Sequence, residues 1–294
     1  MMRIDFMGRS KLWIALSALV ILIGLAALFL RGLNLGIDFE GGTLLQLRFE
    51  KTPTTNEIRT ALADYGLQKS GVQLSGGNTA LIRTRDLSDQ ERQNVLTGLK
   101  TKLGNYEILR VEKVGAVVSQ ELRNNAFLAL TIASLLMLVY ITLRFEFKFA
   151  VAGILALIHD VLITVGLFAL FQVEIDSTFV AAILTIVGYS INDTIVVFDR
   201  IRENLKKRRK EPLAELVNTS IRETLTRSIN TSLTTLFTVL ALLFFGGETT
   251  KVFALAIFIG LTSGTYSSIF IASPIWYLWR RGELDHGTPA AARS

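Results

Sequence analysis

The stretch that decides the fold is LWIALSALVILIGLAALFL, residues 12–30, which runs for 19 residues without a charged side chain. Uncharged runs of 20, 20 and 28 residues follow at 124–143, 228–247 and 252–279. Each is long enough to cross about 30 Å of hydrocarbon at about 1.5 Å per residue. Two further apolar stretches, 149–171 and 177–199, contain the ionisable residues His159, Asp160 and Asp193. The pattern predicts an α-helical polytopic membrane protein with six transmembrane helices.

Composition excludes two other classes of protein. Half of the 294 residues are hydrophobic, 19% are charged, mean hydropathy is +0.44, and there is no cysteine. A soluble enzyme with one aqueous core carries about 25% charged residues, and a disulfide-stapled secreted module needs cysteines. Residues 12–30 also end at Arg31 without a small-residue cleavage pattern, so they are interpreted as a retained anchor rather than a signal peptide.

Positive residues predict the orientation in the membrane. They gather before the first helix, in a loop at 200–227 and after the sixth helix, where Arg280 and Arg281 stand. The expected location is the cytoplasmic membrane. The positive-inside bias then places both termini, including the tail at 282–294, in the cytoplasm. The net charge of +6 is therefore attributed to topology, with the basic loop contacting anionic lipids rather than nucleic acid.

Residues 32–123 are the one aqueous domain and are expected outside the cytoplasm. Alternation and helical spacing predict strands at 43–49, 72–74, 80–83 and 106–114, with helices at 55–65 and 88–104. Gly76-Gly77-Asn78 indicates a hairpin, and Ser88 with Glu91 forms a capping-box pattern. The order βαββαβ predicts a ferredoxin-like α+β fold. The domain contains neither His nor Cys, which favours a recognition or docking module.

Three ionisable residues fall inside the predicted bundle or at its edge. Asp160, beside His159, is twelfth in a 23-residue span, and Asp193 is six residues from the cytoplasmic end of its helix. Buried charges at this depth cost at least about 2.5–3.5 kcal/mol on insertion scales and so need a reason. Arg227 stands at the mouth of the next, antiparallel helix, which predicts a salt bridge with Asp193.

Two interpretations of this pair stay open at the level of sequence. One is a static ion pair that fixes helix packing. The other is a proton relay, in which protonation of Asp193 releases Arg227 while Asn192 and Thr231 hold water or the proton path. Asp160 and His159 are further candidates for this relay. The small residues Gly260, Gly264 and Ser268 favour close packing of the last helix. The alternative is that they let this helix slide against its neighbours during a conformational cycle.

Intramembrane hydrolysis is the competing chemistry. His159 with Ser190 invites comparison with a serine hydrolase, and Asp160 with Asp193 invites comparison with an aspartyl protease. The glycine expected after a rhomboid-type serine is missing, and no Gly-x-Gly-Asp signature is present. We therefore expect no enzymatic activity, no cofactor and no metal site, with the proton as the coupling ion.

Four motifs carry a resemblance to a known family. They are GIDFEGG at 36–42, His159-Asp160, VGYSINDTIVVFDRIREN at 187–204, and SINTS at 228–232 directly after Arg227. Together they resemble the SecD/SecF family of bacterial protein-export membrane proteins, of the RND superfamily, in its SecF type. The likeness runs from the first to the sixth helix and departs from the family pattern at Ala116 and Ser119, where Pro and Gly are usual.

The resemblance implies partners and roles. A SecD partner would supply six more helices, and the complex would associate with the SecYEG channel, YidC and YajC. It would use the proton-motive force in late steps of export of an unfolded preprotein. The family's proton-path residues map onto Asp193 and Arg227. We expect the GIDFEGG stretch to be a hinge or seat of motion through Gly36, Asp38, Phe39, Gly41 and Gly42.

Two alternatives are kept beside this hypothesis. One is half of a proton-driven RND-type exporter of small molecules or lipids, although such pumps carry larger external domains. The other is a structural scaffold, in which neutralising the charged pair would affect assembly and not proton flux.

Overall fold

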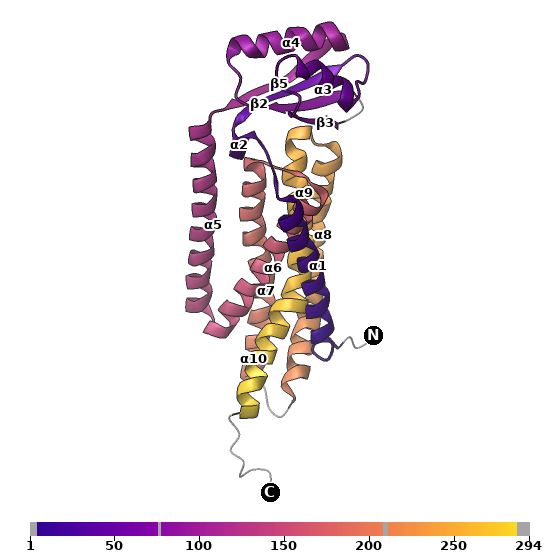
Figure 1. The fold of residues 1–294 in the computed structure, drawn as a ribbon. Helices are drawn as coiled ribbons and strands as arrows, with labels where there is room; N and C mark the ends of the chain where they lie inside the picture. Colours follow the sequence, from indigo (N-terminus) through magenta and orange to yellow (C-terminus); the bar gives the residue numbers. More distant parts are fainter. Residues whose placement is uncertain (1–4, 76–77, 208–210, 287–294) are drawn as a thin grey trace. The chain divides into compact units, whose positions relative to one another are not determined.

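The structure is a computed structural model that describes residues 5–75, 78–207 and 211–286. It divides into two compact units (Figure 1). The first unit is helical and comprises Met1–Asn34 with Leu128–Ser294, and the second, Leu35–Phe127, holds the four-stranded sheet. Gly76 and Gly77 of the predicted hairpin lie outside the described residues.

Long helices account for most of the chain (Figure 1). Their bounds are α1 Ser10–Arg31, α5 Ala116–Arg144, α6 Phe147–Phe171, α7 Ser177–Lys207, α8 Leu213–Phe245, α9 Glu248–Ser267 and α10 Ser273–His286. A π-helical segment, Ser268–Ala272, joins α9 to α10, so that Thr250–Arg281 forms one span. Six helices in the described residues are long and apolar enough to cross a membrane. The predicted six-helix membrane fold is confirmed.

The region expected to be a basic loop at 200–227 is mostly helical, and that prediction is wrong. α7 continues to Lys207 and α8 already begins at Leu213. Leu213, Leu216, Val217 and Ile221 are buried at helical spacing against the core of the helical unit. Basic residues ended the predicted membrane span near residue 199, but they do not end the helix, because a helix in water tolerates charges on its outer face.

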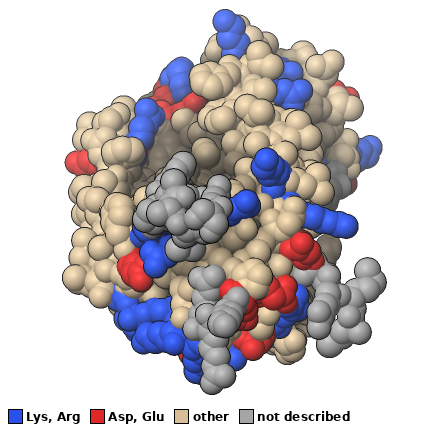
Figure 2. All heavy atoms as spheres, turned by 90° about the horizontal axis from the view of Figure 1, so that it is seen from below, with Lys and Arg blue, Asp and Glu red and all other residues tan. Residues whose placement is uncertain are grey.

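Polar bonds join these two helix extensions to each other and to the start of the chain. Arg200 of α7 pairs with Glu223 of α8 at 2.7 Å, and Asn204 donates to Ser220 at 2.9 Å. Asn218 accepts the backbone N–H groups of Phe6 and Met7, both of which are buried. Lys and Arg side chains are prominent on this end of the helical unit (Figure 2).

The π-helical segment has a local cause in the sequence. Pro274 lies two residues beyond its end and lacks the N–H that would bond to a carbonyl four residues earlier. Ser273 compensates at this point by donating its hydroxyl to the carbonyl of Ser268 at 2.9 Å. Such single-turn π segments are frequent at functional sites.

The smaller unit has the predicted ferredoxin-like arrangement. Its strands β2 Gly42–Phe49, β3 Gly71–Ser75, β4 Thr79–Thr84 and β5 Tyr106–Val114 pair antiparallel in the order β3-β4-β2-β5. Helices α3 Thr55–Ala63 and α4 Asp89–Leu103 complete the βαββαβ order. Leu45, Ile58, Ile82 and Leu99 belong to a core with 0% exposure. The register places Leu45 opposite both Ile82 and Val111.

Both helices of this unit begin with a complete capping box. Ser88 accepts the N–H of Glu91 at 3.2 Å, and Glu91 accepts the N–H of Ser88 at 2.8 Å, as predicted. Thr54 and Glu57 make the same reciprocal pair at the start of α3. Each box satisfies two backbone donors that the first helical turn leaves unpaired.

The GIDFEGG stretch forms a helical turn, α2 Ile37–Glu40, that leads into β2. Gly41 and Gly42 have backbone φ angles of +77° and +125°, which residues with a Cβ atom rarely adopt. A Cβ on Gly42 would lie 2.2 Å from the carbonyl oxygen of Thr84. Phe39 is buried, and Arg123 donates to its carbonyl oxygen. The two glycines are therefore required by the path of the backbone.

α5 begins at Ala116, earlier than the predicted 124, because its polar first turns are also helical. Ser119, which departs from the family pattern, is buried and donates its hydroxyl to the carbonyl of Ala116 at 3.0 Å. The short strands β1 Asn34–Leu35 and β6 Glu174–Ile175 form a separate two-stranded ladder.

Candidate functional site

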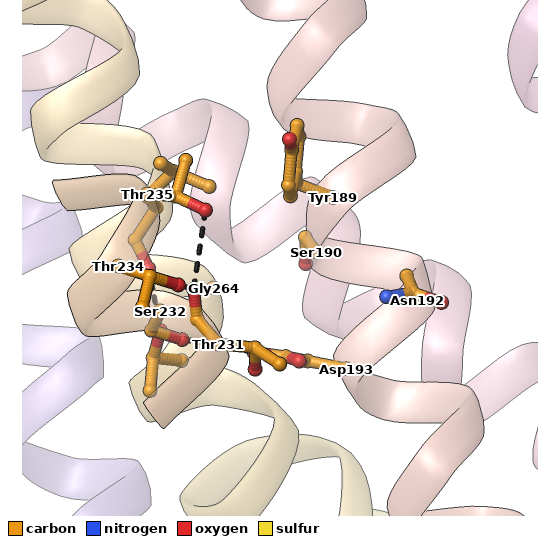
Figure 3. A pocket seen from close by; sticks show the side chains of 11 residues that line it. Tyr189, Ser190, Asn192, Asp193, Thr231, Ser232, Thr234, Thr235 and Gly264 are labelled. Atoms are coloured by element: carbon orange, nitrogen blue, oxygen red, sulfur yellow. Dashed lines mark hydrogen bonds between the residues drawn. The ribbon is translucent and has the colours of Figure 1, made fainter. Parts of the chain in front are cut away.

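A polar cavity of about 240 Å³ lies between α7, α8 and α9 in the helical unit (Figure 3). Three of the predicted relay residues, Asn192, Asp193 and Thr231, line it together. The other lining residues are Tyr189, Ser190, Ser232, Thr234, Thr235, Leu261, Gly264 and Thr265. The cavity therefore combines one carboxylate with a lining rich in hydroxyl groups, inside three helices long enough to span a membrane.

Asp193 is half-buried and is held by hydroxyl groups from two other helices. Ser232 of α8 donates to Asp193 Oδ2 at 3.2 Å, and Thr265 of α9 donates to Ser232 Oγ at 2.7 Å. Figure 3 shows Asp193 reaching from α7 toward α8. The resulting chain, Thr265 to Ser232 to Asp193, links three helices. Thr265 Oγ1 also lies 2.8 Å from the carbonyl oxygen of Leu261, which is a second acceptor for its proton.

Arg227 does not form the predicted salt bridge with Asp193. Among the described residues, no ion pair within 4.0 Å joins the two side chains, and Arg227 is exposed. Its charge attracts the Asp193 carboxylate through space. Ser232 stands five residues beyond Arg227 in α8, about 7 Å along the helix axis. Asp193 is therefore level with Ser232, deeper than the sequence-based estimate placed it relative to Arg227.

The threonines of α8 turn their protons toward their own backbone. Thr231 donates to the carbonyl of Arg227 at 3.0 Å, Thr234 to that of Asn230 at 3.0 Å, and Thr235 to that of Thr231 at 3.1 Å. Such back-bonding leaves the oxygen lone pairs of the hydroxyl groups as acceptors on the open side. The α8 wall is therefore suited to solvate a positive species such as hydrated protons.

Asp160 and His159 lie behind this cavity and do not line it. Asp160 has 0% exposure and His159 has 5%. Ser190, which lines the cavity, donates to Asp160 Oδ2 at 2.6 Å, while His159 Nδ1 meets Asp160 Oδ1 at 2.9 Å. The serine hydroxyl points at the carboxylate and not at the histidine, so the Ser–His arrangement of a hydrolase is not formed.

The comparisons with known proteins decide the family. Residues 94–282 match the family model for the C-terminal part of the protein export membrane protein SecD/SecF. The chain belongs to the SecD/SecF family. Residues 26–53 match the model for the SecD/SecF GG motif, and this range includes the GIDFEGG turn with Gly41 and Gly42. With its six spans, the chain is a multi-pass membrane protein.

Named relatives place the chain at the SecF type of the SecD/SecF family. The protein translocase subunit SecF of Sebaldella termitidis is 46% identical over 286 residues, covering 95% of this chain and 93% of that one. SecDF of Bacillus subtilis is 40% identical over 95% of this chain, but the match covers 38% of that relative. The crystal structure of SecDF from Thermus thermophilus, a translocon-associated membrane protein, matches with a TM-score of 0.89 and 41% identity. It covers 95% of this chain and 39% of that one.

The small residues of α9 lie against α7 in this SecD/SecF structure. A Cβ on Gly260 would lie 2.3 Å from Ile186, and a Cβ on Gly264 would lie 3.1 Å from the Cβ of Ser190. Ser268 instead belongs to the π-helical segment and donates to the carbonyl of Thr265 at 3.1 Å. Two of the three predicted packing residues, Gly260 and Gly264, thus allow α9 to pack closely against α7.

Sequence reasoning missed several residues around the two carboxylates. They are Ser232 and Thr265 beside Asp193, and Ser263 and Ser267, which each donate to Asp160 at 2.7 Å. Ser263 and Ser267 are four residues apart in an apolar helix and both are buried. That spacing on one face of α9 is the signal that could have identified them. No group of three or more His, Asp or Glu side chains that could hold a metal ion occurs in the described part of the chain.

Proposed function

We propose that this chain works as the SecF-type subunit of a protein translocase accessory complex and couples the proton-motive force to late steps of preprotein export. The observation that carries the proposal is Asp193, a carboxylate inside the membrane-spanning helices that faces a hydroxyl-lined cavity. Relatives named as protein translocase subunits support the export function. Proton coupling rests on the chemistry of the cavity alone.

A SecD partner follows from the length of the SecDF relatives. In Bacillus subtilis SecDF, the match to this chain accounts for 38% of the protein. We infer that a separate SecD chain corresponds to the part of Bacillus subtilis SecDF that this chain does not match. Contacts with the SecYEG channel, YidC, YajC, preprotein and anionic lipids are part of the same proposal.

The proposed topology places both termini in the cytoplasm and residues 32–123 outside it. Basic residues at the C-terminal ends of α7 and α10 and before α1 support this orientation in a cytoplasmic membrane. The aqueous unit would then meet the preprotein after it leaves the channel.

The coupling step is a change of charge at Asp193. While ionised, the carboxylate accepts from Ser232 and is attracted to Arg227 across the face of α8. Protonation from the cavity removes that charge and weakens both interactions, because a neutral carboxyl group accepts hydrogen bonds less strongly. α7 and α8 are then free to shift, and the motion passes to the outer unit through the GIDFEGG turn. The step forms and breaks no covalent bond to substrate and uses no cofactor.

Export under an imposed proton gradient tests the proposal. Asp193→Asn and Arg227→Gln, each in the chain assembled with its partner, are expected to abolish the stimulation of export by the gradient. Asp199→Asn is the matched control, because Asp199 lies on the same helix, is exposed and does not line the cavity. Unimpaired gradient-driven export in both variants would refute proton coupling at this site.

The two alternatives predict different outcomes of the same experiment. An exporter of small molecules or lipids would lose proton-driven efflux and leave preprotein export unchanged. A scaffold would show loss of assembly with the partner, and no change of proton flux per assembled complex.

A further inference from the structure

Asp160 is the most deeply buried carboxylate among the described residues whose contacts are given, and four donors surround it. Ser190 of α7 and Ser267 of α9 approach Oδ2 at 2.6 and 2.7 Å, while Ser263 of α9 and His159 Nδ1 approach Oδ1 at 2.7 and 2.9 Å. Both oxygens are therefore doubly coordinated. The carboxylate fastens α6, α7 and α9 together at the middle of the predicted third span.

The charge of this cluster is not balanced by a fixed cation. Within the described chain, no Lys or Arg contacts Asp160, and α7 and α9 present only serines to it. The titratable groups near it are His159, the Tyr266 ring stacked on that histidine at 6.2 Å, and Asp193 beyond Ser190. Tyr266 donates its hydroxyl to the carbonyl of Trp13 at 3.0 Å. Uptake of one proton by the His159–Asp160 pair is therefore the local way to neutralise the cluster.

One proton changes the His159–Asp160 pair from a net charge of −1 to zero. With neutral His159 and ionised Asp160, an uncompensated charge lies inside the bundle, which is costly even when it is hydrogen-bonded. With one more proton, the pair is either a neutral carboxylic acid beside neutral imidazole or an internal ion pair. His159 Nε2 has no hydrogen-bond partner in the structure, so the ring's bonding is directed at Asp160 alone.

Ser190 connects this pair to the cavity. It is 4% exposed, lines the cavity beside Asp193, and donates to Asp160 Oδ2. A hydroxyl group accepts on its lone pairs while it donates its own proton. A proton arriving at Ser190 Oγ from the cavity can therefore replace the one that Ser190 passes to Asp160, with no net change at the serine.

We propose that Asp160, together with His159, is a second and deeper proton-holding site that exchanges protons with the Asp193 cavity through the Ser190 hydroxyl. Its part in export rests on the proposed proton coupling, whereas its existence does not. In the step, the Ser190 O–H bond breaks as Asp160 Oδ2 gains the proton. Ser190 Oγ takes a replacement from protonated Asp193 or from a hydronium ion in the cavity, which is left as a carboxylate or a water molecule. The cavity of about 240 Å³ has room for several waters at about 30 Å³ each.

Protonation of Asp160 changes the hydrogen bonds that hold α6 to α9. Once protonated, the carboxyl group is itself a donor and satisfies fewer of the four donors that face it. Ser267 already has a second acceptor, the carbonyl of Gly264 at 3.2 Å. It is also the last residue of α9 before the π-helical segment Ser268–Ala272. Proton uptake at Asp160 therefore loosens α9 next to its least regular turn.

Infrared difference spectroscopy of the full chain in lipid, as a function of pH, tests the proposal. The carbonyl stretch of a protonated, buried carboxyl group is expected to grow as the pH falls, to vanish in Asp160→Asn and to persist in Asp193→Asn. Ser190→Ala is expected to keep the band and to slow its hydrogen–deuterium exchange by at least about tenfold, equivalent to about 1.4 kcal/mol of added barrier.

Ser263→Ala is the matched control, because Ser263 also donates one hydrogen bond to Asp160 but does not line the cavity. It is expected to leave the exchange rate within a small factor of the wild type. Absence of a titrating band in the wild type overturns the proposal, and so does equal slowing in the two serine variants. The wild-type titration needs no variant, so a poorly folding Asp160→Asn does not remove the test.

The outcome separates this site from the proposed function. A titrating band with Ser190-dependent exchange, in a chain whose Asp193→Asn variant still exports under the gradient, supports the deeper site and refutes coupling at Asp193. Loss of gradient-driven export in Asp193→Asn without a titrating band supports the coupling and refutes the deeper site.

Discussion

Replacing Gly42 by alanine is expected to destabilise the smaller unit strongly, and the structure gives the size of the effect. The new Cβ would lie 2.2 Å from the carbonyl oxygen of Thr84, where ordinary contact begins at 3.4 Å, an overlap of 1.2 Å. The obstacle is backbone in the neighbouring strand, so no side chain can rotate away. Gly42 also has φ of +125°, which costs a residue with a Cβ about 1–3 kcal/mol.

Moving β2 or β4 to remove the overlap adds about 1–3 kcal/mol, as overpacking does elsewhere. The two costs together are about 2–6 kcal/mol, a large part of the about 5–15 kcal/mol that stabilises a typical domain. Gly71→Ala is the matched control in the same sheet, because its Cβ would make ordinary contact with Arg83 at 3.6 Å. That change is expected to be neutral or to stabilise by up to about 1 kcal/mol.

Amide hydrogen exchange on the full chain in lipid measures the difference. Amides of β2 and β5 that open with the whole unit are expected to exchange at least about 30-fold faster in Gly42→Ala, since each 1.4 kcal/mol corresponds to a factor of ten. Amides of α6 and α7 in the helical unit serve as an internal reference. If Gly42→Ala and Gly71→Ala give the same exchange rates, the backbone conflict assigned to Gly42 is wrong.

Three further predictions concern other parts of the molecule. Arg85 and the Ser88 cap lower the pKa of Glu91 to about 2, below its ordinary 4.5. Glu91 therefore stabilises the smaller unit above about pH 4.5, and this contribution is lost as the pH falls toward 2. Glu91→Gln should flatten that part of the pH dependence of amide exchange in α4. Asn218→Ala leaves the N–H groups of Phe6 and Met7 unpaired at about 1–3 kcal/mol each and removes the amide that donates to Asp5, so limited proteolysis should release the N-terminal segment faster. Gly24→Ala would place a Cβ 2.8 Å from the Cα of Gly166 and should lower the thermal stability of the helical unit by about 1–3 kcal/mol, while Gly188→Ala, with nothing within 4 Å, should not.

Length and alternation made most of the fold predictable. An uncharged run of about 20 residues has few other stable environments than a bilayer, so the six spans followed from counting. The βαββαβ order followed from period-two and helical spacing because the smaller unit buries one continuous core. The extension of α7 and α8 was missed for the converse reason. Basic residues mark where a membrane ends, and they carry little information about where a helix ends.

Relations between helices were less predictable than the helices themselves. The sequence placed Asn192, Asp193 and Thr231 on facing helices, and the cavity does bring them together. It placed Arg227 level with Asp193, but a pairing of antiparallel helices can slip by a turn without altering either hydropathy pattern. Serine is close to neutral in hydropathy, so the donors from Ser263, Ser267 and Ser232 left no trace in the profile.

The single hydroxyl proton of Ser190 makes the surroundings of Asp160 and Asp193 different. Ser190 has one hydroxyl proton and gives it to Asp160 at 2.6 Å, so it offers the cavity only lone pairs. The α8 threonines likewise give their protons to backbone carbonyls. Much of the cavity wall around Asp193 is therefore composed of acceptors, a lining that stabilises a proton carrier and repels an anion. A proton that enters can rest on Asp193, which has the weaker hydrogen bond of 3.2 Å, or pass Ser190 to a carboxylate with four donors. Asp193 is thus suited to rapid proton exchange with the cavity. Asp160 is suited to hold a proton for longer, and its protonation weakens its hydrogen bonds to α9.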